Sequence, residues 1–391
     1  MIPYGKHYLG EDDIQAVVDV LRSGVLTQGP IVEAFEQIIA DYVGAKYAVA
    51  VSSGTAALHL AALVAGVNPE TTLITSPITF VASANAGLYA GGKVAFADVD
   101  SESINISPSA LEAALEANPS TKAIVPVHFA GLPCDMPVIK ALADKAEAAV
   151  IEDAAHALGA SYPDGQRVGC CAHSLMTIFS FHPVKAIAAG EGGMVTTNDE
   201  TVYRQLLRLR SHGINKLDDL LLDMDHAYTN GVKNMWYYEM QELGFHYRIT
   251  DIQCGLAISQ MKKLDAFQAH RRKLVARYDQ AFSGDKLIKP AQLGGKARSG
   301  NHIYPVRINF EGLGRSRNQV MSLLQEAGIG SQVHYMPVPM QPLYQRLGQN
   351  PTDYPNAMAY YNEALTIPMF FDLTFDRQDY VIKSLLEIVD A

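Results

Sequence analysis

The sequence predicts an α/β protein with a large domain, built on a mixed and mostly parallel sheet of seven strands, and a smaller α+β domain. Short apolar runs alternate with amphipathic stretches up to about residue 200, which is the pattern of βαβ units around a parallel sheet. Beyond about residue 245 this alternation stops. A chain of 391 residues is long enough to divide its core, so we expect domains at 1–245 and 246–391.

The elements of the large domain follow in order. Two amphipathic helical patterns, DDIQAVVDVLRSG and PIVEAFEQIIADYVG, come first. Seven apolar runs are the expected strands: YAVAVSS, TTLITS, KVAFADVD, KAIVPVHF, AAVIED, SLMTIFSF and GGMVTTND. Helical patterns lie between them, and Ser107 and Asp135 stand where helix caps belong. TVYRQLLRLRSHG predicts a further helix, and the polar, aromatic stretch from Lys216 to Glu242 predicts a loop or excursion.

The smaller domain has fewer elements. It begins with a long helical segment, TDIQCGLAISQMKKLDAFQAHRRKLVARYDQAF. The strand-like runs NHIYPVRINF and GIGSQVHYMP then flank a helix over SRNQVMSLLQEAG. This order of elements predicts an α+β fold.

Composition limits the possible partners. The formal net charge of -10 argues against broad binding to nucleic acid or to an anionic membrane, but leaves room for a local basic pocket. The four cysteines have no C-x-x-C spacing, which fits a reducing cytoplasm. The N-terminus lacks the pattern of a signal peptide, and no run has the length of a membrane span. We expect a cytoplasmic enzyme with no nucleic acid or membrane partner.

The segment SSGTAALHL places Ser53, Gly54 and Thr55 where a strand passes into a helix. Free backbone N–H groups and the helix dipole at such a junction form a site for an anion such as phosphate. Read alone, the motif is equally explained by an ordinary helix cap and turn.

In AAVIEDAAHALGA an apolar strand ends on Glu152 and Asp153. Their carboxylates then lie at the edge of the sheet where open α/β folds bind ligands. A carboxylate there can keep a pyridine nitrogen protonated. The alternative is a solvated or loop-capping acid.

A third segment, SLMTIFSFHPVKAIAAGEGGMV, runs from a strand into Lys185 and a glycine-rich turn. Desolvation at a strand end lowers the pKa of a lysine and makes its neutral amine available for a Schiff base. Ser180 can add a hydroxyl to the phosphate site. The alternative is a surface lysine on a connecting loop.

Together the three segments supply an anion site, a partner for a ring nitrogen and a Schiff-base lysine, and this combination predicts pyridoxal 5'-phosphate as cofactor. Phe80, again just past a strand, can stack on the cofactor ring, or else fill the core. Other chemistries have less support. The sequence has no H-E-x-x-H, no paired Cys/His spacing, no P-loop and no G-x-G-x-x-G motif, and we expect no metal.

The motifs TQGP, SSGTAAL, TFVASANA, EDAAHALGA, FSFHPVKAIAAGEGG, LRSHG, HYRITDIQ and VHYMP resemble the DegT-type family of nucleotide-sugar aminotransferases over nearly the whole chain. The resemblance implies the fold type I (aspartate aminotransferase-like) architecture of pyridoxal-phosphate enzymes. It also implies a homodimer with active sites at the subunit interface and L-glutamate as amino donor. A branch of the family with histidine at the position of Lys185 dehydrates its sugar, so Lys185 favours the transaminase branch.

Residue roles follow from the motif matches. The resemblance implies that Lys185 is the Schiff-base lysine and proton shuttle, that Asp153 pairs with the ring nitrogen, and that His156 lies beside the ring. The positions around the phosphate or substrate are Ser53, Gly54, Thr55 and Ser180, and Phe80 takes the stacking position. Many relatives have asparagine where this chain has His246, and that asparagine reaches the cofactor phosphate across the dimer; a histidine N–H can replace it as donor.

Within the family, TQGP, FSFHPVK, NHIYPV and VHYMP look most like the transaminases of pseudaminic acid biosynthesis. This implies a UDP-linked 4-keto-6-deoxy-N-acetylhexosamine that accepts nitrogen at C4. The candidate substrate contacts are Tyr4, Leu26, Thr27, Gln28, His302, Tyr304, His334 and Tyr335. Met336 departs from the polar residue expected after VHY. A 3-keto sugar, a dTDP- or GDP-linked sugar, a dehydratase and a non-catalytic regulator stay as alternatives.

Overall fold

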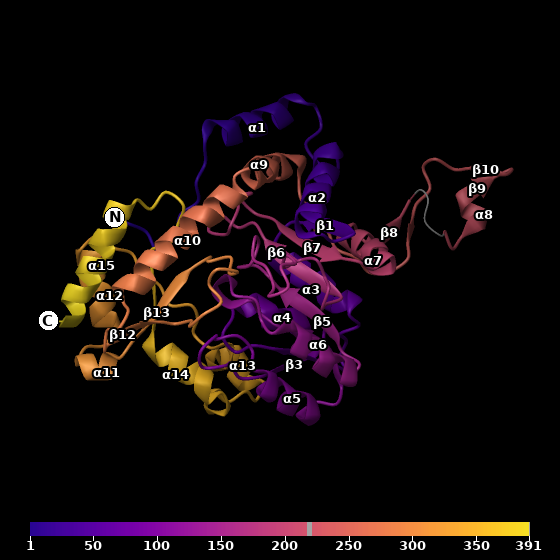
Figure 1. Ribbon diagram of the computed structural model, residues 1–391. Coiled ribbons are helices and arrows are strands. Elements are labelled where there is room, and N and C mark those ends of the chain that lie inside the picture. Colours follow the sequence, from indigo (N-terminus) through magenta and orange to yellow (C-terminus); the bar gives the residue numbers. More distant parts are fainter. Residues whose placement is uncertain (217–220, 391) are drawn as a thin grey trace.

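The computed structural model describes residues 1–216 and 221–390, and its centre is a sheet of seven strands in the order β1-β7-β6-β5-β4-β2-β3 (Figure 1). β7 is antiparallel to both of its neighbours, whereas the other neighbouring pairs are parallel. All seven predicted runs become strands of this sheet, which confirms the α/β fold. The strands are β1 (Tyr47–Val51), β2 (Thr72–Thr75), β3 (Lys93–Phe96), β4 (Thr121–Val125), β5 (Ala149–Asp153), β6 (Met176–Ser180) and β7 (Gly193–Thr197).

Helices cover both faces of the sheet because successive strand residues point to opposite sides. Ile124 and Phe179 belong to the core on one face, and the adjacent Val125 and Ile178 belong to the core on the other. Two buried faces explain why the strands are continuous apolar runs. On the first face lie α2 (Pro30–Val43), α5 (Pro108–Ala117), α6 (Met136–Lys145) and α9 (Asp251–Met261); on the second lie α3 (Gly54–Val64), α4 (Val81–Tyr89) and α7 (Glu200–Arg210).

The predicted helix caps are partly realised. Ser107 accepts a hydrogen bond from the Ala110 N–H at 3.5 Å, as expected of an N-cap. Asp135 occupies the N-cap position of α6, but its side chain makes no capping hydrogen bond. Pro137 is the second residue of this helix and lacks an N–H group, so one of the two donors that such a cap binds is missing.

The C-terminal part is built on a three-stranded antiparallel sheet in the order β12-β13-β14. Its strands and helices are β12 (Ile288–Pro290), β13 (Tyr304–Ile308), β14 (Ala364–Ile367), α10 (Leu264–Ala281), α11 (Phe310–Leu313), α12 (Arg317–Glu326), α13 (Pro342–Arg346), α14 (Pro355–Glu363) and α15 (Phe375–Asp390). The predicted strand over NHIYPVRINF is confirmed as β13. The predicted strand over GIGSQVHYMP is wrong, because Ile329 and Gln332 each form a single bridge to a different partner and no ladder results.

The long predicted helix over residues 250–282 is divided into α9 and α10. The break falls at Lys262 and Lys263. The Lys263 ammonium binds Asp12 at 2.7 Å and Asp13 at 2.6 Å on α1 (Glu11–Arg22), which packs against α9. A contact with a distant helix therefore fixes the end of α9.

The first residues of the chain lie against its C-terminal part (Figure 1). The Ile2 N–H donates to Gly328 O, and Ile2 O accepts from the Gly330 N–H, both at 2.7 Å. The division of the chain at residue 245 stays a prediction, but residues 1–4 pair with segments on the far side of that boundary.

Residues 214–216 and 221–240 form an arm that projects away from the body (Figure 1). It contains β8 (Ile214–Asn215), α8 (Met224–Ala227), β9 (Tyr228–Thr229), β10 (Val232–Lys233) and β11 (Glu239–Met240). The excursion predicted from Lys216 to Glu242 thus holds short paired strands, except that residues 217–220 lie outside the described residues. None of the helices in the described ranges is long and apolar enough to cross a membrane.

Candidate active site

A cavity of about 450 Å³ opens at the carboxyl ends of β1, β2, β5 and β6, the edge where open α/β sheets bind ligands. The predicted site residues that line it come from segments far apart in the sequence: Tyr4, Ser53, Gly54, Thr55, Phe80, Asp153, His156, Ser180, Lys185, His302, His334 and Tyr335. The fold therefore brings most of the predicted cofactor residues and half of the predicted substrate residues to one place.

Ser53 and Gly54 begin α3 at one side of the cavity. The Ser53 hydroxyl caps the helix by accepting the Ala56 N–H at 3.1 Å. A Cβ atom at Gly54 would lie 2.9 Å from Ser180 Cβ, so only glycine allows the helix start to approach β6 this closely. Free N–H groups and the Ser180 hydroxyl thus gather at a helix N-terminus, which is the arrangement that binds phosphate.

Asp153 ends β5, and its carboxylate lies at the inner wall of the cavity. Ser83 Oγ donates a hydrogen bond to Asp153 Oδ2 at 2.6 Å, and the Ala155 N–H donates to Oδ1 at 3.1 Å. Ser83 was not among the predicted site residues, although the sequence carried a signal for it. It stands three residues after Phe80, one helical turn further, and so faces the same side of α4.

Lys185 lies in the turn after β6, and its N–H donates to His182 O at 2.8 Å. Burial lowers the pKa of the Lys185 amine to about 8, and the negative charge of Asp153 opposes this shift. A substantial share of neutral amine is therefore present near neutral pH, as the sequence interpretation required.

Three histidines surround the lysine: His156, His302 and His334. Burial and then the positive charge of Lys185 lower the pKa of His334 to about 4. Burial is also the main reason that the pKa values of His156 and His302 lie well below their usual range. All three rings are neutral at pH 7. The Nδ1 atoms of His156 and His302 are buried and have no hydrogen-bond partner in the part of the chain that the structure describes.

Two aromatic side chains close the cavity. Phe80 is 59% exposed, so it does not belong to the core and is free to stack on a bound ring. Tyr335 stacks beside His156 with ring centroids 6.1 Å apart, and its hydroxyl lies 3.1 Å from His156 Nε2.

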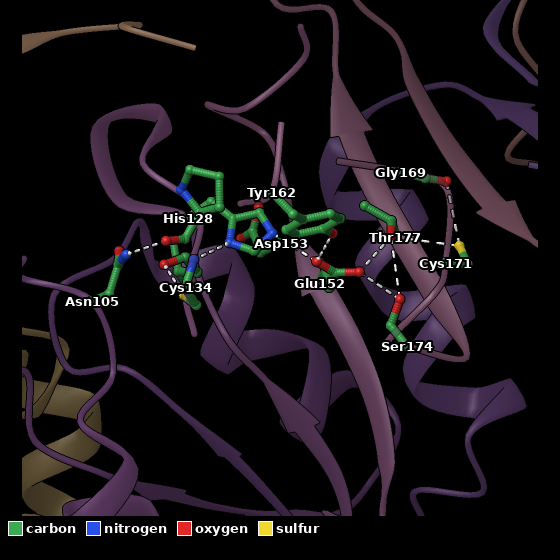
Figure 2. A network of polar contacts seen from close by, with 12 residues as sticks. Asn105, His128, Cys134, Glu152, Asp153, Tyr162, Gly169, Cys171, Ser174 and Thr177 are labelled. Carbon is green, nitrogen blue, oxygen red and sulfur yellow. Dashed lines mark hydrogen bonds and ion pairs between the residues drawn. The ribbon is translucent and has the colours of Figure 1, made fainter. Parts of the chain in front are cut away.

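Glu152 precedes Asp153 on β5, and its side chain points to the opposite side of the strand. It is fully buried (Figure 2). Its oxygens accept hydrogen bonds from four side chains: His128 Nε2 (2.8 Å), the Tyr162 hydroxyl, Ser174 Oγ (2.5 Å) and Thr177 Oγ1 (3.1 Å). Burial alone would raise the pKa of Glu152, but the hydrogen bond and charge of His128 lower it overall. The two strand-end acids were interpreted together in the sequence, whereas only Asp153 reaches the cavity.

The remaining predicted site residues do not line this cavity. Leu26 and Thr27 lie near the start of α9, where Leu26 O accepts the Asp251 N–H and Thr27 pairs with Thr250. Gln28 lines a second cavity. The Tyr304 hydroxyl, in the core of the small sheet, donates to Asp279 Oδ1 at 2.5 Å, so the expected substrate contact has no support from its position.

His246 also lies outside the cavity. It pairs with Ser211, and its ring is 5.4 Å from that of His212. Its predicted contact across a dimer stays a prediction. Within residues 1–216 and 221–390 there is no group of three or more histidine, cysteine, aspartate or glutamate side chains that could hold a metal ion.

A model of the DegT/DnrJ/EryC1/StrS aminotransferase family matches residues 7–386. The chain belongs to this family. The resemblance seen in the motifs, and with it the aminotransferase fold, is confirmed along nearly the full length.

Members of the family are similar to the chain from end to end. The spore coat polysaccharide biosynthesis protein SpsC of Bacillus subtilis is 38% identical over 99% of this chain and 97% of its own. A UDP-4-amino-4,6-dideoxy-N-acetyl-beta-L-altrosamine transaminase of Campylobacter jejuni is 35% identical over 100% of this chain and 98% of its own. The structure of Helicobacter pylori PseC, an aminotransferase in pseudoaminic acid biosynthesis, has a TM-score of 0.89 at 30% identity. The match covers 100% of this chain and 99% of PseC.

Pyridoxal 5'-phosphate is the cofactor of this DegT-family aminotransferase. A similar structure, the putative sugar aminotransferase Spr1654 of Streptococcus pneumoniae, is known in its PLP form. It has a TM-score of 0.88 at 29% identity, and the match covers 100% of this chain and 98% of Spr1654. The cavity fits this group: a glycine-dependent anion site at α3, an acceptor at Asp153, an amine of lowered pKa at Lys185, and an unpartnered nitrogen at His156.

Proposed function

We propose that this aminotransferase moves the amino group of L-glutamate onto C4 of a UDP-linked 4-keto-6-deoxy-N-acetylhexosamine, as in pseudaminic acid biosynthesis. One observation carries the reaction type: Lys185, with its lowered pKa, faces the same cavity as Asp153 and the anion site at Ser53–Thr55. The names of the Campylobacter jejuni relative and of the Helicobacter pylori structure support the choice of sugar.

In this proposal the residues divide the work by position. Ser53, Thr55, Ser180 and the start of α3 bind the cofactor phosphate, and Asp153 keeps the ring nitrogen protonated. Bound pyridoxal phosphate supplies an electron sink beside the reacting carbon. Lys185 would hold the cofactor through its amine, and the same amine would move the proton at the reacting carbon in both halves of the reaction.

The neutral rings on the other wall suit a sugar. His302, His334, Tyr335 and Tyr4 offer hydrogen-bond donors and acceptors without adding charge. Tyr4 reaches this wall because the Met369 N–H donates to Tyr4 O at 2.9 Å, which fixes the first residues against the C-terminal part. We assign these four residues to the keto sugar and glutamate.

The half-reaction with glutamate tests the reaction type. Holoenzyme mixed with glutamate is expected to lose its visible absorbance and to release one equivalent of 2-oxoglutarate. Lys185→Ala is expected to bind the cofactor without multiple turnover, since no other lysine lines the cavity among the described residues. Sustained turnover by Lys185→Ala would exclude the assignment.

A panel of keto sugars tests the substrate. The proposal expects the UDP-linked 4-keto sugar to have a higher kcat/KM than 3-keto sugars or the dTDP- and GDP-linked forms. Activity with glutamate but a preference for one of those sugars would keep the aminotransferase and replace the acceptor. A cofactor that binds but never reacts with glutamate would point to a dehydratase or a regulator.

The charge of the cavity supports a homodimer with shared active sites. Both proposed substrates are anions, yet Lys185 is the only lysine or arginine among the described residues that line the cavity. The cation that binds a carboxylate or diphosphate then comes from outside this cavity wall. We place the arm and the loop at His246 at the contact with a second copy.

The arm has the composition of an interface. Met235 is 83% exposed and Trp236 73% exposed, together with Leu222, Val232, Tyr238 and Met240. Aromatic and methionine side chains are enriched at protein interfaces, and an exposed group of this kind marks one. A second copy is therefore a suitable partner for this surface.

Trp236 is the only tryptophan in the chain, so its fluorescence reports on the arm directly. We expect the purified protein to have the mass of a dimer and a blue-shifted emission. Trp236→Ser is expected to weaken the dimer, and Tyr380→Ser, an exposed aromatic on α15 far from the arm, is the control. A monomeric, active wild-type protein would refute the shared site.

The four buried free cysteines fit the reducing cytoplasm that we propose as its location.

A further inference from the structure

Two hydroxyl groups behind Asp153 form a short chain of hydrogen bonds. Thr79 Oγ1 lies 2.7 Å from Ser83 Oγ, and Ser83 Oγ lies 2.6 Å from Asp153 Oδ2. All three side chains are buried. Thr79 belongs to the turn after β2 and Ser83 to the first turn of α4, so the chain links two further elements to the end of β5.

The direction of these hydrogen bonds follows from the chemistry of their ends. An ionised carboxylate only accepts hydrogen bonds, so Ser83 donates its single hydrogen to Asp153. The Ser83 oxygen is then free to accept the hydrogen of Thr79. Among the described residues, Asp153 Oδ1 accepts only the Ala155 N–H, at 3.1 Å, so it keeps a lone pair that none of their donors occupies.

We propose that Ser83 is a positioning residue: its hydroxyl holds the Asp153 carboxylate in the orientation that binds the ring nitrogen of the cofactor. Thr79 in turn holds the Ser83 hydroxyl in place. The proposal rests on the proposed function, in which Asp153 meets that nitrogen. A hydrogen bond to a charged acceptor inside a protein is short and strong, and the 2.6 Å contact has this character. Without it, the carboxylate is held at one oxygen only.

A purely structural role for Ser83 has a separate signature. Its hydroxyl also lies 3.4 Å from Phe80 O, so it can contribute to the start of α4 without any effect on Asp153. Loss of that contact would lower stability but would leave the properties of the bound cofactor unchanged. The experiment therefore needs a readout on the cofactor itself.

Ser83→Ala, Ser83→Thr and Thr79→Val are compared with the wild-type holoenzyme. Two quantities are measured: the dissociation constant of pyridoxal phosphate and the pH midpoint of its visible absorbance. Ser83→Ala is expected to weaken cofactor binding about tenfold, as for the loss of a hydrogen bond to a charged group. It is also expected to move the midpoint to higher pH. A less ordered carboxylate retains the ring proton less strongly, and loss of that positive charge makes the Schiff-base nitrogen, whose protonation the visible absorbance reports, easier to protonate. Ser83→Thr restores both values, and Thr79→Val gives a smaller change in the same direction.

Thr75→Val is the matched control. Thr75 is a fully buried hydroxyl at the end of β2, and it donates to Val125 O at 2.7 Å rather than to Asp153. Its loss is expected to change the melting temperature and neither cofactor property. If Ser83→Ala behaves like Thr75→Val while Asp153→Asn loses cofactor binding, the positioning role is refuted and the proposed function stands. If Asp153→Asn also behaves like wild type, the proposed function fails and takes the inference with it.

Discussion

In the proposed function Lys185 bonds to the cofactor, so its lowered pKa predicts how fast the apoenzyme captures pyridoxal phosphate at each pH. Only the neutral amine bonds to the aldehyde of pyridoxal phosphate. With a pKa of about 8, the neutral fraction at pH 7 is about one tenth. A lysine in water, with a pKa near ~10.4, has a neutral fraction of roughly one in 2,500 at the same pH. Burial at the end of β6 thus raises the reactive fraction by about two orders of magnitude.

The assay is stopped-flow absorbance after apoenzyme is mixed with pyridoxal phosphate between pH 6 and pH 10. The pKa of an amine is lowered here, so the neutral form increases as pH rises and dominates above pH 8. The second-order rate is expected to rise nearly tenfold per unit below that pH and to level off above it. Asp153→Asn removes the charge that opposes the shift and should move the midpoint to lower pH. A rate that continues to rise through pH 10 would refute the reasoning.

Two further changes test the elements that support the site. Glu152→Gln replaces one carboxylate oxygen by an NH2 group, so two of the four donors around this side chain face another donor. It is expected to lower the free energy of unfolding by roughly 2–5 kcal/mol. Tyr162→Phe removes only one hydrogen bond and is expected to cost about 1 kcal/mol. Chemical denaturation of the apoenzyme measures both, and an equal loss would contradict the network. Gly54→Ala brings a Cβ to 2.9 Å from Ser180 Cβ and is expected to weaken cofactor binding at least about tenfold. Thr75→Val, a change outside the cavity lining, should bind the cofactor normally. Equilibrium titration with pyridoxal phosphate distinguishes the two, and equal affinities would disprove the close approach.

The depressed pKa of Glu152 also sets the sign of a pH effect on stability. A carboxyl with a lowered pKa in the folded state stabilises the protein at pH values above its unfolded pKa, near ~4.3. This contribution declines below that value and is lost as pH falls through the lower pKa of the folded state. Thermal melts of wild type and Glu152→Gln should therefore converge in acid, and a constant difference down to the lowest accessible pH would contradict the assignment.

Local patterns in the sequence determined much of the fold. Each of the seven apolar runs predicted in the large domain became a strand, because a strand buried on both faces needs a short continuous apolar segment and little else. The motifs around Ser53, Asp153 and Lys185 each place a functional group directly after a strand. Since the carboxyl ends of these parallel strands meet at one edge of the sheet, the meeting of the three groups followed from the strand pattern.

Expectations that depended on distant partners were less reliable. The helix over 250–282 has an unbroken helical pattern, but the ion pairs of Lys263 with α1 end it early. The run GIGSQVHYMP has strand composition, yet a strand requires a neighbour along its length, and this segment meets two different neighbours for one residue each. Tyr304 was predicted to contact substrate beside His302. Strand alternation points its side chain into the core of the small sheet, and the contact stays a prediction.

The sequence by itself identified the aminotransferase family, because the motifs that mark it, and the lysine, carboxylate and anion-site residues proposed for its chemistry, lie in short segments. The tertiary structure decided how those groups are supported and tuned. Nothing local shows that Ser83 meets Asp153 across 70 residues, that Glu152 turns away into a buried network, or that three histidines stay neutral around Lys185. These depend on burial and on contacts between distant elements, which exist only once the chain has folded.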